Sequence, residues 1–372
     1  PVIIFVALVR WTLMTPASQG RLMFPALAAI LTLLALGLIQ WAPRRMHIPW
    51  SYTVVTVSLV VAFSAPFRVI APVYARPGTV SEDGLSALSN RLDVTFGGRM
   101  KLLGYAVDRD QVFPEEKLHV TLYWQGLAPI ERDYSVFVHL LAESDLVLAQ
   151  RDTYPGRGTW PTTAWVPGEV IEDTVTLKVP PTAHTPSQAV IEVGVYDFET
   201  GARLPAEDES GQVLGDNVRF HSVQVLSKLG SPVPNPVHFN FEQRLALVGY
   251  RLDRRAAAPG EALRLTVYWQ ALRRMEENYT VFTHILGGGD RIWAQQDNQP
   301  QSGAAPTSSW IPGTLIEDRY ELRLRSDTPP GVYDVEVGLY LHETGERLKV
   351  LGEWGRLQGD HVILTNVRVV GS

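Results

Sequence analysis

The chain of 372 residues repeats one long module, and this duplication limits what it can fold into. A constant shift of 145 positions maps residues 96–173 onto residues 241–318 without a gap. The Trp-x-Pro-Gly motif at 165–168 returns at 310–313, and a shift of 144 carries Glu-Thr-Gly-x-Arg-Leu at 199–204 onto 343–348. Because solenoid repeats have periods of about 20–50 residues, so long a period indicates duplication of a whole domain.

The pattern within each copy is typical of β structure. Apolar and polar residues alternate along 118–124 and again along 263–269, as in a half-buried strand. Pro and Gly separate the further strands expected in copy one, each with a counterpart in copy two: 102–107, 135–141, 147–152, 171–179, 189–196 and 218–225. We therefore expect an Ig-like β-sandwich in each copy, at 91–228 and 238–372. The prolines of the linker 229–237 favour a short, semi-extended spacer.

An apolar strip precedes the repeats. Residues 22–42 carry no charge and are long enough to cross a bilayer as a helix. Residues 50–67 form a second candidate, with Trp50 and Tyr52 as interfacial anchors, and residues 1–9 resemble the tail of a third. The chain begins inside an apolar run without Met, so we interpret 1–75 as the end of a truncated polytopic region. The alternatives are a buried helical hairpin of a soluble domain and a signal peptide; two spans in series without a cleavage site argue against the latter.

The predicted fold class is therefore mixed, with N-terminal transmembrane α-helices followed by two tandem all-β Ig-like sandwich domains. The most basic short turn lies at 43–47, which the positive-inside rule places in the cytoplasm. We therefore expect a bacterial cytoplasmic membrane protein in which everything after about residue 70 is extracytoplasmic.

Charge and cysteine content exclude several classes of function. All 39 acidic residues follow position 81, together with 27 of the 33 basic ones, so this part carries a net charge of about −12. Nucleic-acid binding needs clustered Lys and Arg, and we expect none here. The chain contains no Cys, which excludes disulfides, thiolate metal sites and a Cys nucleophile.

Several repeated residues are candidates for a core or a site. Trp124 and Trp269 lie on the apolar parity, so we expect core tryptophans rather than ligand platforms. His139 and His284 have no second His at ligand spacing, which favours hydrogen-bonded core histidines over metal ligands. Six carboxylates form a weak calcium candidate: Asp152, Glu172, Asp173, Asp297, Glu317 and Asp318. Solvation of turns and strand edges is the alternative.

Four tryptophans are candidates for carbohydrate stacking. Trp165 and Trp310 precede Pro-Gly in loops, Trp160 has no counterpart, and Trp293 replaces Leu148. Exposed aromatic rings stack on sugars, although loop tryptophans also close the ends of sandwiches. The modules contain no G-x-S-x-G, no H-E-x-x-H and no phosphate loop, so we nominate no catalytic residue.

The segment Gln-Gly-Arg-Leu-Met-Phe-Pro at 19–25 resembles the late membrane region of polytopic GT-C glycosyltransferases of the family 39 and aminoarabinose-transferase kind. The modules look like sandwich domains appended to such enzymes. The resemblance implies a polyprenyl-phosphate-linked sugar donor, a lipid-phosphate contact at Arg21, and a catalytic acid in an N-terminal loop outside this chain. Interfacial snorkelling of Arg21 is the alternative to the phosphate contact.

The resulting hypothesis is the C-terminal fragment of a membrane glycosyltransferase, inactive alone, whose sandwiches position a cell-surface glycan. We expect the lipid bilayer as a partner and no cofactor in the fragment, with a divalent cation conceivable in its parent. The alternative is a non-enzymatic, membrane-anchored surface protein displaying two adhesion or carbohydrate-binding modules. A third hypothesis is the outer part of a transporter or assembly subunit.

Overall fold

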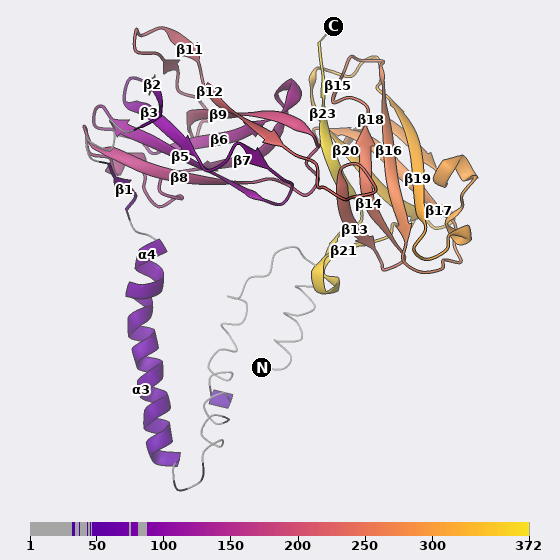
Figure 1. Cartoon of the computed structure of the whole chain (residues 1–372), viewed down its shortest axis with the longest axis horizontal. Coiled ribbons are helices and arrows are strands. Elements are labelled where there is room, and N and C mark those ends of the chain that lie inside the picture. The colour runs from indigo at the N-terminus through magenta and orange to yellow at the C-terminus, as the bar shows by residue number, and fades with distance from the viewer. Residues whose placement is uncertain are drawn as a thin grey trace. The chain divides into compact units, whose positions relative to one another are not determined.

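In the computed structural model, residues 47–73, 76–80 and 88–371 are described, together with the isolated positions 32, 33, 37, 43 and 45. An apolar helix opens this part (Figure 1). It runs as α3 (His47–Ala65), one π-helical turn (Pro66–Ile70) and α4 (Ala71–Val73). The π turn begins at Pro66, which cannot donate a backbone hydrogen bond within a helix.

This helix contains the predicted second membrane segment. Ile48–Arg68 is 21 residues long with a mean hydropathy of 1.6, and none of its most apolar window is buried within the protein. Those values fit a helix that crosses a bilayer. The predicted spans at 22–42 and 1–9 lie outside the described residues, apart from isolated positions of the former.

The first sandwich consists of two sheets. The seven-stranded sheet has the order β1-β8-β5-β3-β2-β10-β11, and the five-stranded sheet has the order β4-β12-β9-β6-β7. The strand bounds are β1 (Gly78–Thr79), β2 (Asn90–Phe96), β3 (Met100–Val107), β4 (Gln111–Val112), β5 (Lys117–Gly126), β6 (Tyr134–Leu141), β7 (Val147–Thr153), β8 (Val170–Lys178), β9 (Ser187–Asp197), β10 (Ala206–Glu207), β11 (Val213–Gly215) and β12 (Val218–Val225).

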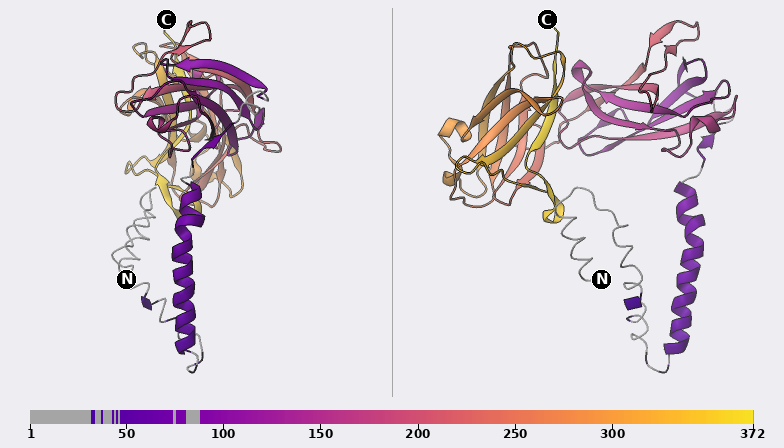
Figure 2. Two further views of the ribbon diagram at one scale, coloured as in Figure 1. Left: turned by 90° about the vertical axis from the view of Figure 1, so that its left-hand side faces the viewer. Right: turned by 180° about the vertical axis from the view of Figure 1, so that it is seen from behind.

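The second sandwich repeats this topology. Its sheets have the orders β19-β16-β14-β13-β21-β22 and β15-β23-β20-β17-β18. The strand bounds are β13 (Pro236–Phe241), β14 (Leu245–Leu252), β15 (Ala256–Ala257), β16 (Ala262–Ala271), β17 (Tyr279–Gly287), β18 (Arg291–Asn298), β19 (Leu315–Arg323), β20 (Gly331–Leu341), β21 (Val350–Leu351), β22 (Leu357–Gly359) and β23 (Val362–Val369). The two-layer build of each copy can be followed in Figure 2.

The two copies differ at one sheet edge. β1, from the segment that follows the helix, pairs antiparallel with β8, with Gly78 opposite Glu172 and Thr79 opposite Ile171. The backbone N–H of Val80 then donates to the carbonyl of Val170 at 3.1 Å. The corresponding edge strand of the second sandwich, β19, has no such added strand among the described residues. The duplication is therefore complete in the sandwich, and β1 is an addition to copy one.

The core lies between the sheets, as the alternation predicts. Along β5 the residues that point inward are buried and the others are more exposed. Trp124 and Trp269 have no exposed area, and each packs against an aromatic ring, Phe96 or Phe241, with centroids 5.7 Å apart. The expectation of core tryptophans is confirmed.

Hydrogen bonds join the two sandwiches at the end of the linker 229–237. Apart from Leu351–Gly359, both sandwiches belong to one compact unit. Buried Asn235 accepts a hydrogen bond from the backbone N–H of Thr185 at 2.6 Å and donates to the carbonyl of Tyr250 at 3.1 Å. The hydroxyl of Tyr250 donates to the carbonyl of Thr182 at 2.7 Å. Asn235 thus satisfies backbone groups of both copies, which the composition of the linker does not reveal.

We predict that Trp124→Ala and Trp269→Ala each lower the free energy of unfolding by about 3–5 kcal/mol, because each leaves a large cavity in a close-packed core. Denaturant unfolding of the two variants measures this. Trp354→Ala is the matched control, since that indole is 95% exposed. A core variant as stable as the control would contradict the packing described.

Candidate functional site

The tryptophans predicted to stack on sugars are mostly enclosed. Trp165 is 4% exposed and Trp310 3%, and the ring of Trp165 lies 6.2 Å from that of core Trp124. The indole N–H of Trp310 donates to the carbonyl of Ala305 at 2.9 Å. The loops that carry the Trp-x-Pro-Gly motif therefore fold these rings into the ends of the sandwiches, where they present no open face to a sugar.

The other two candidate rings are covered by arginines. Trp293 is 7% exposed, and the guanidinium of Arg291 lies 4.1 Å from its ring centroid. Trp160 is half-buried, with the guanidinium of Arg76 at 4.8 Å. Trp354 is the widely exposed indole of the described residues, at 95%. No alternating pattern marks Trp354 in the sequence, because this residue lies in a short turn, Glu353–Gly355.

The six carboxylates of the calcium candidate do not converge. Glu172 and Asp173 are adjacent in β8, so their side chains lie on opposite faces of the sheet; Glu172 is exposed, whereas Asp173 is 2% exposed. Glu317 and Asp318 repeat this arrangement in β19. Asp152 and Asp297 lie beside histidines on the other sheet. Among the described residues no three His, Asp or Glu side chains form a group suited to a metal.

The two inward carboxyls have different partners. Burial raises the pKa of Asp173 to about 6, although the backbone N–H of Gly156 donates to it. One of its oxygens has no hydrogen-bond partner. Burial also raises the pKa of Asp318, but the hydroxyl of Tyr320 donates to that carboxylate at 2.5 Å. Copy one has Val175 at the position of Tyr320, which explains the unsatisfied oxygen of Asp173.

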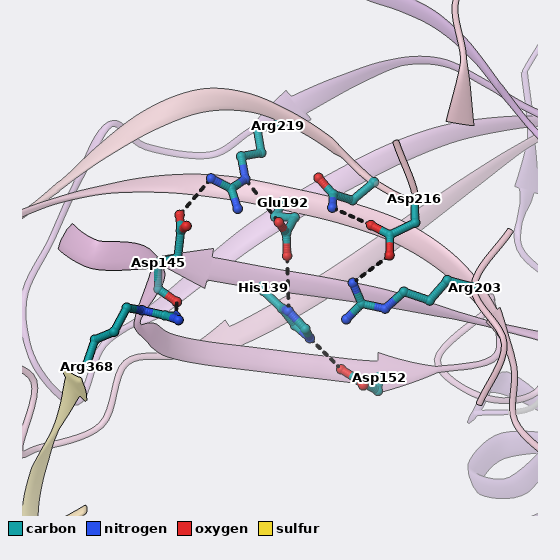
Figure 3. A network of polar contacts seen from close by, with 9 residues as sticks. His139, Asp145, Asp152, Glu192, Arg203, Asp216, Arg219 and Arg368 are labelled. Carbon is teal, nitrogen blue, oxygen red and sulfur yellow. Dashed lines mark hydrogen bonds and ion pairs between the residues drawn. The ribbon is translucent and has the colours of Figure 1, made fainter. Parts of the chain in front are cut away.

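Each repeated histidine belongs to a polar network on the outer face of its five-stranded sheet. Figure 3 shows the network around His139 in the first sandwich. His139 in β6 lies opposite Glu192 in β9, with Nδ1 3.5 Å from that carboxylate, and its Nε2 lies 3.2 Å from Asp152. Arg219 bonds Glu192 at 3.0 Å and Asp145 at 2.7 Å. The hydrogen bond from His139, opposed by burial and assisted by Arg219, lowers the pKa of Glu192.

The second sandwich has a corresponding network in which other residues surround the carboxylate. His284 lies opposite Glu336 at 2.8 Å and 3.5 Å from Asp297. Burial by itself would lower the pKa of His284, but its bonds to Asp297 and Glu336 raise it to about 9. His361 approaches Glu336 to 3.4 Å, while Ile363 stands where copy one has Arg219. The prediction of hydrogen-bonded histidines describes both sites, although parity places the rings on the outer face of the sheet and not in the core.

A groove of about 670 Å³ lies on the outer face of the six-stranded sheet in the second sandwich. Its central row crosses three strands, with Arg251 in β14 opposite Thr266 in β16, and Thr266 opposite Arg319 in β19. In the next row Arg264 is opposite Glu321. The rest of the lining consists of Asp253, Leu265, Gln296 and Tyr320. Sequence reasoning missed this site because its residues are brought together only by cross-strand register.

Comparison with known proteins gives structural neighbours and no family. No family model and no curated protein matches the chain. A membrane-anchored protein from Corynebacterium diphtheriae is 10% identical with a TM-score of 0.26, covering 72% of this chain and 58% of its own length. A collagen adhesin from S. aureus is 8% identical with a TM-score of 0.20, covering 77% and 96%. Likeness of this size does not extend to a shared ligand.

The interpretation as a GT-C glycosyltransferase fragment is corrected by these findings. A membrane-anchored protein and an adhesin are among the solved structures similar to the chain, and the described residues hold one helix of membrane-spanning length. The motif at 19–25 misled because a pattern of seven common residues is too short to specify a family. Arg21 lies outside the described residues. The polyprenyl-phosphate donor is no longer proposed, because it was implied only by the glycosyltransferase resemblance.

The raised pKa of His284 predicts a pH-dependent stability. Its pKa in the folded state is about 9, above the ordinary histidine pKa of 6.5, so the stabilisation is complete below pH 6.5 and is lost as pH rises through 9. We expect His284→Gln to remove a contribution on the order of 2 kcal/mol at pH 6 and much less at pH 10. Unfolding measured across this range tests it, with the exposed His342→Gln as control. Equal losses at both pH values would contradict the assignment.

Proposed function

We propose that the chain is a non-enzymatic, membrane-anchored protein that displays two β-sandwich modules for adhesion or glycan binding. The observation that carries the proposal is the continuity between anchor and module. Helix α4 ends at Val73 and β1 begins at Gly78, so only four residues separate an apolar helix from a strand of the first sandwich. A tether this short keeps the first module close to the membrane surface.

The attachment of β1 supports a short tether, because the chain is held to the first sandwich from Arg76 onward. Arg76 forms an ion pair with Glu169 and lies over the ring of Trp160, just before β1 adds to the sheet. Backbone pairing, an ion pair and a cation–π contact thus hold the first residues after the tether. The packed contacts of Asn235 and Tyr250 extend this order to the second module.

The side of the membrane and the number of helices are further parts of the proposal. The basic turn at 43–47 precedes the helix, which favours a cytoplasmic start and an extracytoplasmic end. Both modules then lie outside a bacterial cytoplasmic membrane, where their Ig-like sandwiches contact a cell-surface glycan or another surface ligand. The apolar stretch 22–42 supplies an additional span.

The membrane attachment is tested by fractionation. We expect the full chain to remain with membranes after washing at high salt and alkaline pH and to be released by detergent, because its apolar helix is inserted in the lipid. A variant that begins at Arg76 should appear in the soluble fraction. Release of the full chain by the alkaline wash would contradict the proposal.

A further inference from the structure

We propose that the groove on the second sandwich binds an anionic saccharide, whose carboxylate or sulfate groups are held by Arg251 and Arg264. This site rests on the glycan-binding part of the proposed function, to which it gives a ligand class, but it does not depend on membrane attachment, since all the residues that line the groove belong to the second module. Its volume of about 670 Å³ falls within the usual range of small-ligand sites.

The first argument is that two of its cations have no partner. Arg251 and Arg264 are exposed, and within the described part of the chain neither guanidinium forms a hydrogen bond or ion pair. The acidic groups beside them are engaged elsewhere: Asp253 pairs with Arg254 at 3.7 Å and Glu321 with Arg323 at 3.0 Å.

The third arginine of the groove, Arg319, forms an ion pair with Glu317 at 2.6 Å. It therefore contributes only part of its hydrogen-bonding capacity to a ligand. Guanidinium groups present a planar fork of donors that matches carboxylate or sulfate oxygens. The free pair, Arg251 and Arg264, thus forms a local cationic spot in a module, residues 238–372, that holds 15 Arg and Lys and 17 Asp and Glu and has a net charge of about −2.

The second argument is the comparison between copies, which share the same register. In copy one Ala106 lies opposite Thr121, and Thr121 opposite Thr174, where copy two has Arg251, Thr266 and Arg319. The side chains at these positions in copy one are paired with one another. Thr121 bonds Thr174 at 2.9 Å, and His119, at the position of Arg264, bonds Thr176 at 3.0 Å. Because copy one forms the same sheet without these arginines, the fold does not require them.

The surroundings favour a saccharide over other anionic ligands. The hydroxyl of Thr266 and the amide of Gln296 lie in the groove lining, and both suit the hydroxyl groups of a sugar. No side chain lining the groove is an exposed aromatic or apolar group, because Leu265 and Tyr320 are buried. Base stacking and insertion into lipid both need such a group.

A peptide ligand is disfavoured because side chains already form hydrogen bonds with backbone groups at the edge of β19. An extended peptide binds a sheet by adding to its edge strand. Here the amide of Gln301 donates to the carbonyl of Glu317 at 3.0 Å, and the amide oxygen of Gln296 accepts from the N–H of Glu321 at 2.6 Å. Side chains therefore occupy two of the backbone groups that an added strand would use.

The test is titration calorimetry on the full chain in detergent micelles at about 0.15 M salt, near the physiological ionic strength. The probes are oligogalacturonate, a heparin oligosaccharide, a neutral malto-oligosaccharide of equal length and polyphosphate. We expect one of the two anionic saccharides to bind and the neutral one not to. Arg251→Ala/Arg264→Ala should weaken that binding at least tenfold, with an unchanged melting temperature.

The charge-matched control is Arg273→Ala/Arg274→Ala, which removes two exposed arginines from a loop of the same module. It should bind as the parent does, and Arg251→Lys/Arg264→Lys should retain part of the affinity. The proposal is overturned if neither anionic saccharide binds, if both double alanine variants lose affinity equally, or if polyphosphate binds as tightly as the saccharides.

Discussion

The structure of both modules depends on burial of one row of side chains between two sheets. Trp124 and Trp269 have no exposed area at equivalent positions of β5 and β16, and Phe96 and Phe241 meet them in the same way. Burial of large aromatic rings fixes the distance and register of the sheets. The outer faces are then free to vary without loss of the fold, so differences between the copies can be interpreted.

Three features of the outer faces and edges can be compared between the copies. The histidine–carboxylate pairs His139–Glu192 and His284–Glu336 persist, which fits a role in holding adjacent strands together. The groove arginines occur in copy two alone, which fits a ligand. The third feature is the exposed sheet edge, which different contacts cover in the two copies.

One position decides how the sheet edge is covered, because the residue that suits one copy would not suit the other. Gly156 of copy one has a φ of +67°, and a side chain there would approach Pro77 to 2.9 Å, so glycine leaves room for β1 and the segment before it. Copy two has Gln301 at this position, and its amide caps the edge carbonyl of Glu317. Unpaired sheet edges invite association between chains, so both devices protect the folded module.

Much of the fold could be predicted from the sequence because alternation is a local signal. The strands expected at 118–124, 135–141 and 218–225 are found as β5, β6 and β12, and the apolar stretch 50–67 lies in one helix. The need for glycine at position 104 could not be predicted: a side chain there would meet the carbonyl of Asn90 at 2.3 Å. Such a close approach depends on a neighbouring strand, which periodicity does not identify.

The candidate sites were harder to predict because they depend on tertiary contacts. Adjacency of Glu172 and Asp173 within a strand was itself a signal against a shared metal, since neighbouring side chains lie on opposite faces. The motif around Trp165 and Trp310 marked a loop, but burial of the rings follows from how that loop closes the sandwich. The groove needed the register of three strands, which no single segment specifies.

The central claim, that an apolar helix holds two sandwiches outside the membrane, is tested most directly by labelling a single cysteine. The chain contains no Cys, and Leu229 is 93% exposed between the modules, so Leu229→Cys introduces one accessible thiol. The account predicts that a membrane-impermeant maleimide labels this variant in intact cells as fully as after lysis. Labelling that requires lysis would place the modules in the cytoplasm and contradict the account.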